Sequence, residues 1–218
     1  AWEIVFQPIV DMATGQPVGY EALTRFPSGQ RADLTFGAAW QVGMGELLEL
    51  ATLRAALADG RRLPSGRWLD LNVSPRLFDN RDRLAELLAT ADRPVVLEVT
   101  EHEAISDYGA IRNVVSGIGA EVRLAVDDAG AGVANFSHIV ELRADFVKLD
   151  IGLVRGINAN FARQALVNGM RHFSRTTGCR LIAEGIETPE EAATLVALGV
   201  EYGQGFLYGR PEIGRAHV

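Results

Sequence analysis

The sequence predicts an α/β fold whose mainly parallel sheet closes into a barrel. Short apolar runs alternate with helical patterns along the 218 residues, and this alternation is typical of parallel sheets. Seven or eight candidate strands in a chain of this length fit a compact barrel, with an open doubly wound sheet as the competing arrangement. A turn at residues 11–17 has the features of a hairpin, so the first strand is expected to run antiparallel to the others.

The expected strands are short, and those in the middle of the chain are rich in Val and Leu, as buried parallel strands are. They are Ile4–Val10, Val18–Leu23, Trp68–Val73, Val95–Val99, Val122–Val126, Phe146–Leu149, Leu181–Ala183 and a weak run near Tyr202.

Helical patterns with one apolar face lie between these runs. Their apolar stripes are Leu50, Leu53 and Leu57; Leu84, Leu87 and Leu88; Ile111, Val114, Val115 and Ile118; and Leu166, Met170 and Phe173. A further helix is predicted to begin after Thr188, because Pro189 suits the first helical position and Glu191 completes a capping box.

Composition excludes several classes of protein. Apolar residues make up 48% and charged residues 22% of the chain, which is ordinary for a globular protein and excludes a disordered or fibrous one. The single cysteine, Cys179, excludes a disulfide framework and a cysteine-based zinc site. The net charge of −7 argues against DNA or RNA polymers as partners. The three tryptophans are expected in the core.

The start of the chain suggests a part of a longer protein. Residue 1 is Ala rather than Met, and an apolar strand pattern begins almost at once, without the charged and apolar regions of a signal peptide. No run approaches the roughly 20 apolar residues that span a bilayer. We therefore expect residues 1–218 to be a single domain excised from a longer multidomain protein.

Polar residues stand where the expected strands end, and in a barrel those ends meet at one mouth. Any single acid there could be a helix cap. Glu21, Glu98 and Lys148 fit that interpretation badly, because they lie inside or at the end of apolar runs, where an unpaired charge costs several kcal/mol. The residues expected at the mouth are Glu21, Asn72, Glu98, Asp127, Asp128, Lys148, Asp150, Glu184 and Gln204.

Six of these residues are carboxylates, and only Arg25 and Lys148 offset them. So much negative charge is tolerable if divalent cations bridge it, and carboxylate and amide oxygens select Mg²⁺ or Mn²⁺ over zinc. The neighbouring Asp127 and Asp128 leave room for two ions. Such a mouth suits an anionic phosphoester, with Lys148 positioning water, deprotonating it or neutralising the pocket.

The sequence resembles the EAL family of bacterial cyclic di-GMP phosphodiesterases. The run EALTR at 21–25 matches the signature tripeptide, and the match continues in order over the rest of the chain. The matching blocks are FQPIV at 6–10, LNVS at 71–74, LEVTE at 97–101, DD at 127–128, VKLD at 147–150, AEGIE at 183–187 and QGF at 204–206.

The resemblance implies a modified TIM (β/α)8-type barrel, hydrolysis of cyclic di-GMP to linear pGpG by a water activated between two metal ions, and a bacterial cytoplasmic domain whose parent protein can be membrane-anchored. It also implies a homodimer and neighbouring sensory or GGDEF domains. The roles that it implies are catalysis by Lys148, Glu184 and Glu21; metal binding by Glu21, Asn72, Glu98, Asp127, Asp128 and Glu184; substrate binding by Gln7, Arg25 and Gln204; and support by Glu101, Asp150 and Glu187.

One segment departs from the family pattern. Residue 129 is Ala where the family usually has Phe, and 133–135 read VAN where an aromatic and serines are usual. In the family this loop connects metal binding to the dimer interface. We therefore expect the departure to alter regulation and dimer strength more than chemistry.

Four alternative functions were weighed against hydrolysis of the dinucleotide. A nicotinamide site lacks its third glycine, which would stand at Asn135. A Schiff-base role for Lys148 conflicts with the surrounding carboxylates, which favour the ammonium form. A glycosidase pair explains neither Asn72 nor the adjacent aspartates. The remaining alternative is a weakly active or inactive receptor for cyclic di-GMP, and the presence of every expected site residue favours the enzyme.

Overall fold

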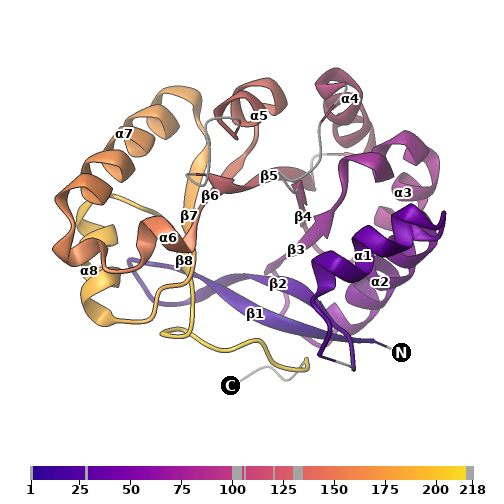
Figure 1. Ribbon diagram of the computed structural model, residues 1–218, viewed down its shortest axis with the longest axis horizontal. Helices are drawn as coiled ribbons and strands as arrows, with labels where there is room; N and C mark the ends of the chain where they lie inside the picture. Colours follow the sequence, from indigo (N-terminus) through magenta and orange to yellow (C-terminus); the bar gives the residue numbers. More distant parts are fainter. Residues whose placement is uncertain are drawn as a thin grey trace.

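The computed structural model describes residues 2–27, 29–99, 105, 107–119, 121–129 and 135–214, without the side chains at 128, 129 and 135–137. Eight strands form a closed barrel in sequence order (Figure 1). They are β1 (Glu3–Asp11), β2 (Pro17–Arg25), β3 (Trp68–Val73), β4 (Val95–Val99), β5 (Val122–Ala129), β6 (Phe146–Leu149), β7 (Arg180–Ala183) and β8 (Tyr202–Gln204).

The first strand is antiparallel to both of its neighbours. It pairs with β2 through a hairpin and with β8 at the closure of the barrel, whereas β2 to β8 are all parallel. The expected modified TIM-type barrel and its inverted first strand are confirmed. The turn between β1 and β2 is held by the side chain of Asp11, which accepts bonds from the amides of Ala13 and Thr14.

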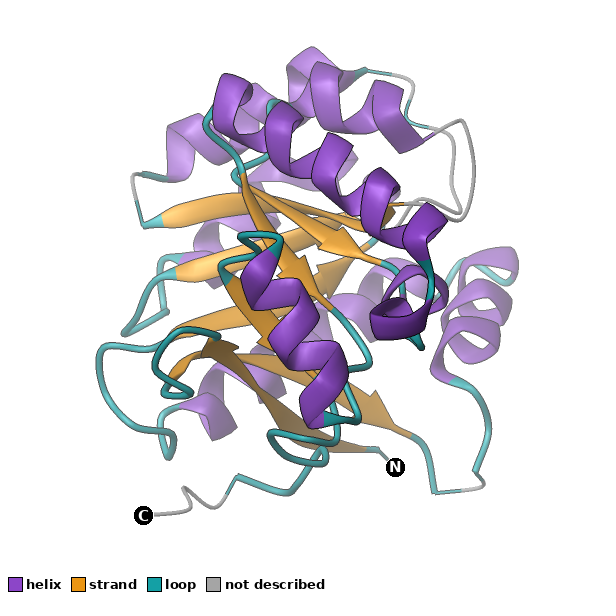
Figure 2. Cartoon of the chain, turned by 90° about the vertical axis from the view of Figure 1, so that its left-hand side faces the viewer, coloured by secondary structure: helices purple, strands orange, loops and turns teal. Residues whose placement is uncertain are grey.

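Helices surround the sheet (Figure 2). They are α1 (Ala32–Gln41), α2 (Gly45–Gly60), α3 (Arg81–Leu88), α4 (Tyr108–Ile118), α5 (Asn135–Leu142), α6 (Ile151–Val154), α7 (Phe161–Thr177) and α8 (Pro189–Ala197), with short 3-10 turns at Pro75–Asn80 and Ile157–Ala159. The capping box at Thr188 and Glu191 is formed as the sequence predicts.

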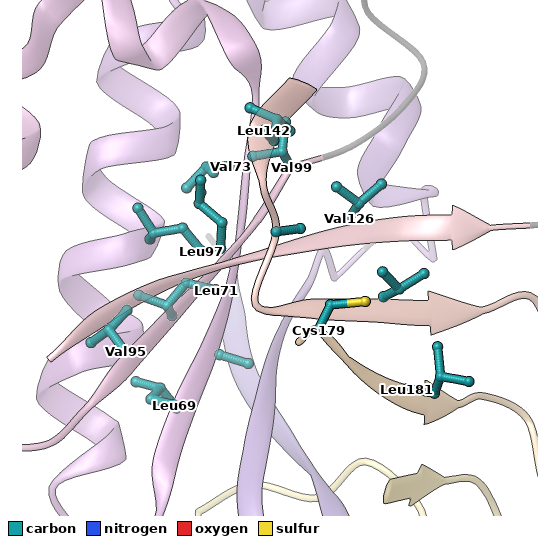
Figure 3. Packing of buried hydrophobic residues seen from close by; sticks show 14 of the residues in the cluster. Leu69, Leu71, Val73, Val95, Leu97, Val99, Val126, Leu142, Cys179 and Leu181 are labelled. Carbon is teal, nitrogen blue, oxygen red and sulfur yellow. The ribbon is translucent and has the colours of Figure 1, made fainter. Parts of the chain in front are cut away.

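Alternation along the strands divides the apolar residues into two groups. One set faces the surrounding helices: Leu69, Leu71 and Val73 of β3 lie beside Val95, Leu97 and Val99 of β4 (Figure 3). The residues between them face the barrel interior. There the apolar filling consists of Ile9, Val96, Ala125, Phe146 and Ile182, packed against Val18, Trp68 and Tyr202.

Three aromatic rings close the end of the barrel at which the parallel strands begin. Trp68, Phe146 and Tyr202, here called the floor cluster, have ring centroids 5.4 to 6.1 Å apart. The Arg180 guanidinium lies over Phe146 and Tyr202 and donates to the Tyr202 hydroxyl. The opposite end of the barrel, the mouth, therefore holds the polar side chains of the interior.

Across the described ranges, the structure contains no helix with the length and apolar character needed to span a membrane.

Candidate active site

A cavity of about 630 Å³ opens at the mouth and extends toward α1 and α2. It begins where β2, β3, β4, β5 and β7 end, so residues far apart in the sequence share one wall. The predicted site residues that line it are Glu21, Arg25, Asn72, Glu98, Asp127 and Glu184. The structure thus brings together four of the six acidic residues that the sequence placed at one mouth: Glu21, Glu98, Asp127 and Glu184.

Lys148 lies at the centre of this arrangement. It follows Phe146 on β6 by two residues, so it points into the same interior one layer above the floor cluster. Its side chain is fully buried. The ammonium Nζ lies 2.6 Å from Glu98, 2.8 Å from Glu184 and 3.7 Å from Glu21.

These carboxylates keep Lys148 charged. Burial by itself lowers the pKa of the ammonium, but attraction by Glu184, Glu21 and Glu98 outweighs burial and raises the pKa well above its usual value. In this arrangement Lys148 is a cation that neutralises and orients its neighbours.

The pKa values of the acidic partners are also raised, which for a carboxyl group favours the neutral form. Burial raises the pKa of Glu184 to about 8, although attraction by Lys148 opposes the shift, and repulsion by Asp127 and Glu21 adds to it. Burial likewise raises the pKa of Glu98 well above its usual value, with Lys148 opposing and Asp127 and Asp70 adding. One buried ammonium therefore leaves part of the negative charge uncompensated.

Asp70 belongs to this group and was not predicted as a site residue. Burial raises its pKa to about 7, with attraction by Lys148 opposing and repulsion by Glu21 and Asp127 adding to the shift. Its side chain is wholly buried, and in the described part of the chain neither carboxylate oxygen has a hydrogen-bond partner. The signal was present in the sequence, because Asp70 lies between Trp68 and Asn72 on alternate positions of β3 and must share their face.

Two amide side chains, those of Asn72 and Gln204, bind Glu21, and a third, that of Gln7, supports Gln204. Asn72 donates to Oε1 at 3.0 Å, and Gln204 donates to Oε2 at 2.5 Å and to the side-chain oxygen of Gln7 at 3.1 Å. Gln7 in turn donates to the carbonyl of Gly209. The predicted substrate contacts Gln7 and Gln204 therefore lie buried beneath Glu21, beyond the residues that line the cavity. Arg25, the third, is exposed at the cavity rim.

Two predicted supporting residues have local partners instead. Asp150 caps α6 by accepting from the Gly152 amide at 2.7 Å, which is the helix-cap role that competed in the sequence. Glu187 is paired with Arg155 near the surface. Glu101 and the side chain of Asp128 lie outside the described residues.

The donor set fits a divalent cation by its chemistry. Asn72 uses its amide nitrogen on Glu21, which leaves its oxygen available beside the carboxylates. Hard oxygen donors of this kind bind Mg²⁺ or Mn²⁺. A cation would offset the burial and the repulsion that raise the pKa values of Glu98 and Glu184. Among the described side chains, no three His, Cys, Asp or Glu residues already form a metal-ion site; the acids are gathered around Lys148.

The cavity also has a wall that the sequence analysis missed. Trp40 of α1, Glu49 of α2 and Ser74 after β3 all line it. Trp40 was expected in the core, but it is only partly buried, and Trp2 is 38% exposed. The usable signal was Glu49, an acid on the same helical face as Leu53 and Leu57.

The family model described as the EAL domain matches residues 2–211. The chain belongs to the EAL domain family. A curated relative of this EAL domain is the probable cyclic di-GMP phosphodiesterase PdeB of Escherichia coli, which is 29% identical over 94% of this chain and 42% of its own length. The probable cyclic di-GMP phosphodiesterase PdeA of the same organism is 32% identical over 66% of this chain and 19% of its own length.

Solved structures share the fold of this EAL domain. The manganese and cyclic di-GMP complex of Klebsiella pneumoniae BlrP1 matches with a TM-score of 0.85 and 32% identity, over 99% of this chain and 57% of that chain. The cyclic di-GMP complex of the PaMucR phosphodiesterase matches with a TM-score of 0.84 and 26% identity, over 97% of both chains. This EAL domain spans less than half the length of the curated relatives PdeA and PdeB.

Proposed function

We propose that this EAL domain hydrolyses cyclic di-GMP to linear pGpG. The observation that carries the proposal is the buried Lys148 held by Glu98 and Glu184 at the base of a cavity rimmed by Arg25. Relatives named as cyclic di-GMP phosphodiesterases, and complexes of family members with that dinucleotide, support the choice of substrate.

The proposed roles of the site residues follow from their charges. Arg25, exposed at the rim, meets a phosphate of the entering dinucleotide, because a guanidinium suits phosphate geometry. Glu21, Asn72, Glu98, Asp127 and Glu184 would hold divalent cations. Such ions, when bound, polarise a phosphodiester and lower the pKa of a water molecule. Lys148 keeps the acids oriented and neutralises one of their charges.

The reaction balances with water as the only co-substrate. The water oxygen forms a new bond to one phosphorus, and the bond from that phosphorus to a ribose 3′ oxygen breaks. The leaving oxygen gains one proton and the other goes to solvent or a carboxylate. The product keeps a 5′ phosphate, as linear pGpG does.

The experiment is a turnover assay on the purified domain with Mg²⁺ or Mn²⁺, with and without EDTA, resolving cyclic di-GMP and pGpG by chromatography. Glu21→Gln removes a proposed cation ligand and should lower the rate at least about 100-fold. Glu86→Gln on α3 is the matched control, because Glu86 is exposed and does not line the cavity. Tight binding of cyclic di-GMP without turnover would replace the enzyme with the receptor.

A further inference from the structure

Helix α1 forms one wall of the cavity although few buried contacts fix its position. None of its residues is buried, and its N-cap, Arg31, makes no side-chain capping bond. Its Phe36 makes an edge contact with Phe26, and most of its packing is against α2. A helix with so few buried apolar residues depends on specific contacts for its position.

Glu49 supplies such a contact from α2. One carboxylate oxygen accepts from the Trp40 indole nitrogen at 2.5 Å, and the other accepts from the Ser74 amide at 3.2 Å. The side chain is 5% exposed, and a carboxylate so deeply buried is tolerated when donors satisfy it. Glu49 thus connects α1 to the segment that follows β3.

Both ends of this connection face the cavity. Trp40 and Ser74 line it together with Glu49, and the buried Ser74 hydroxyl has no hydrogen-bond partner among the residues that the structure describes. The Arg76 guanidinium lies 5.6 Å from the centre of the Trp40 ring. The wall therefore presents a fixed indole and an unused hydroxyl to whatever occupies the cavity.

We propose that Glu49 is a positioning residue for substrate binding, because it fixes Trp40 and Ser74 at their places on the cavity wall. The proposal rests on the proposed function for its substrate, cyclic di-GMP. The hydrogen bonds of Glu49 to Trp40 and Ser74 act on the cavity wall, so its loss weakens binding of substrate and transition state alike. Uniform binding of that kind appears in KM and leaves kcat nearly unchanged.

Substitution by Gln tests the two bonds. Gln has one acceptor oxygen, whereas Trp40 and Ser74 present two donors, so Glu49→Gln satisfies one of them and leaves the other facing an amide NH₂. Loss of one bond to a charged acceptor corresponds to about a tenfold rise in KM. Trp40→Phe removes the donor, and the double variant should be no worse than the more affected single variant.

Gly45→Ala displaces the indole without changing Glu49. A Cβ at Gly45 would overlap the Trp40 ring, whereas one at Gly169 in α7 would meet no atom within 4 Å. Gly45→Ala should therefore raise KM as Glu49→Gln does, and Gly169→Ala should leave it unchanged. The matched control for Glu49→Gln is Glu46→Gln, because Glu46 lies on the same helix and binds Asn80 and Arg83.

The measurement combines KM and kcat for cyclic di-GMP, thermal unfolding and the fluorescence of Trp40 in a background in which Trp2 and Trp68 are Phe. We expect Glu49→Gln and Gly45→Ala to raise KM about tenfold, change kcat less than about twofold and make Trp40 more accessible to acrylamide. An unchanged KM with unchanged quenching overturns the proposal, as does an equal rise in Glu46→Gln. If the parent does not turn over the dinucleotide, the proposed function fails, and its affinity for cyclic di-GMP replaces KM in the same comparison.

Discussion

The two ends of the barrel interior are built from the same strands and contrast completely. On β3, Trp68 joins the floor cluster and Asn72 reaches the mouth; on β6, Phe146 and Lys148 divide in the same way. The floor is a packed aromatic plug, whereas the mouth concentrates buried charge whose pKa values are displaced. Along one strand, therefore, only a few residues lie between the floor, which stabilises the fold, and the mouth, whose buried charges serve chemistry and cost stability.

The largest expected effect is at the mouth. Lys148→Met removes the cation that pairs with Glu98 and Glu184, so turnover should fall at least about 100-fold. The carboxylates lose their partner, which costs about 3–5 kcal/mol of unfolding free energy. Steady-state kinetics and denaturant unfolding measure both effects. Retained turnover in a folded variant would remove Lys148 from the mechanism.

The floor should show the opposite balance. Phe146 is 1% exposed within the floor cluster, so Phe146→Ala should lower the free energy of unfolding by about 3–5 kcal/mol. Turnover per folded molecule should stay within about threefold, because no floor residue lines the cavity. Denaturant unfolding and kinetics below the transition check this. A loss of kcat comparable to that of Lys148→Met would erase the contrast between the two ends.

The raised pKa of Asp70 at the mouth predicts a pH-dependent effect on stability. The pKa of Asp70 is raised to about 7 in the folded state. Between the lower pKa of Asp70 in the unfolded chain and pH 7, the folded state therefore holds a proton that the unfolded state has released. Stability therefore falls as pH rises through this window, by about 1.4 kcal/mol per pH unit. Asp70→Asn should remove this slope in the metal-free domain, so its advantage over the parent grows from about pH 4 to about pH 7.

Unfolding curves across that range provide the measurement for Asp70. An identical pH dependence of stability in the parent and in Asp70→Asn would show that folding does not raise the pKa of Asp70.

The smallest effect is at the rim of the floor. Arg180→Met removes a guanidinium that lies over Phe146 and Tyr202 and donates to the Tyr202 hydroxyl. Partly exposed contacts of this kind contribute about 0.5–1 kcal/mol, so a small drop in melting temperature with unchanged kinetics is expected. Calorimetry would detect it. A change in KM would connect the floor to the mouth, contrary to the comparison.

The strands could be predicted from the sequence because burial imposes a regular pattern of apolar residues on them. The runs near Ile4–Val10 and Val95–Val99 alternate or stay apolar because both faces of a barrel strand are covered, and the predicted strands match β1 to β8 within a few residues. It failed for α1 because that helix buries no residue and so carries no apolar stripe. The short α6 was missed for a related reason: four residues are too few for a period to show.

At the site, the sequence identified the residues at the ends of strands but not those one layer deeper. Asp70 carried a signal in its alternation with Trp68 and Asn72 on β3 but was not predicted as a site residue. Gln204, predicted to contact substrate, binds Glu21 in the structure. Glu49 and Trp40 depend on the packing of two helices, which no local pattern encodes. Residue types at strand ends predict chemistry; the contacts that orient them come from tertiary structure.

We expect divalent cations to complete the mouth by replacing the protons of carboxyl groups whose pKa values are raised in the folded domain. The direct test is calorimetric titration of the EDTA-stripped domain with Mn²⁺ near pH 7, in buffers that differ in ionisation enthalpy. Because Glu184 has a pKa of about 8, binding should release about one proton per domain, and Glu184→Gln should release fewer. Binding without proton release, or no binding in the folded domain, would contradict the account.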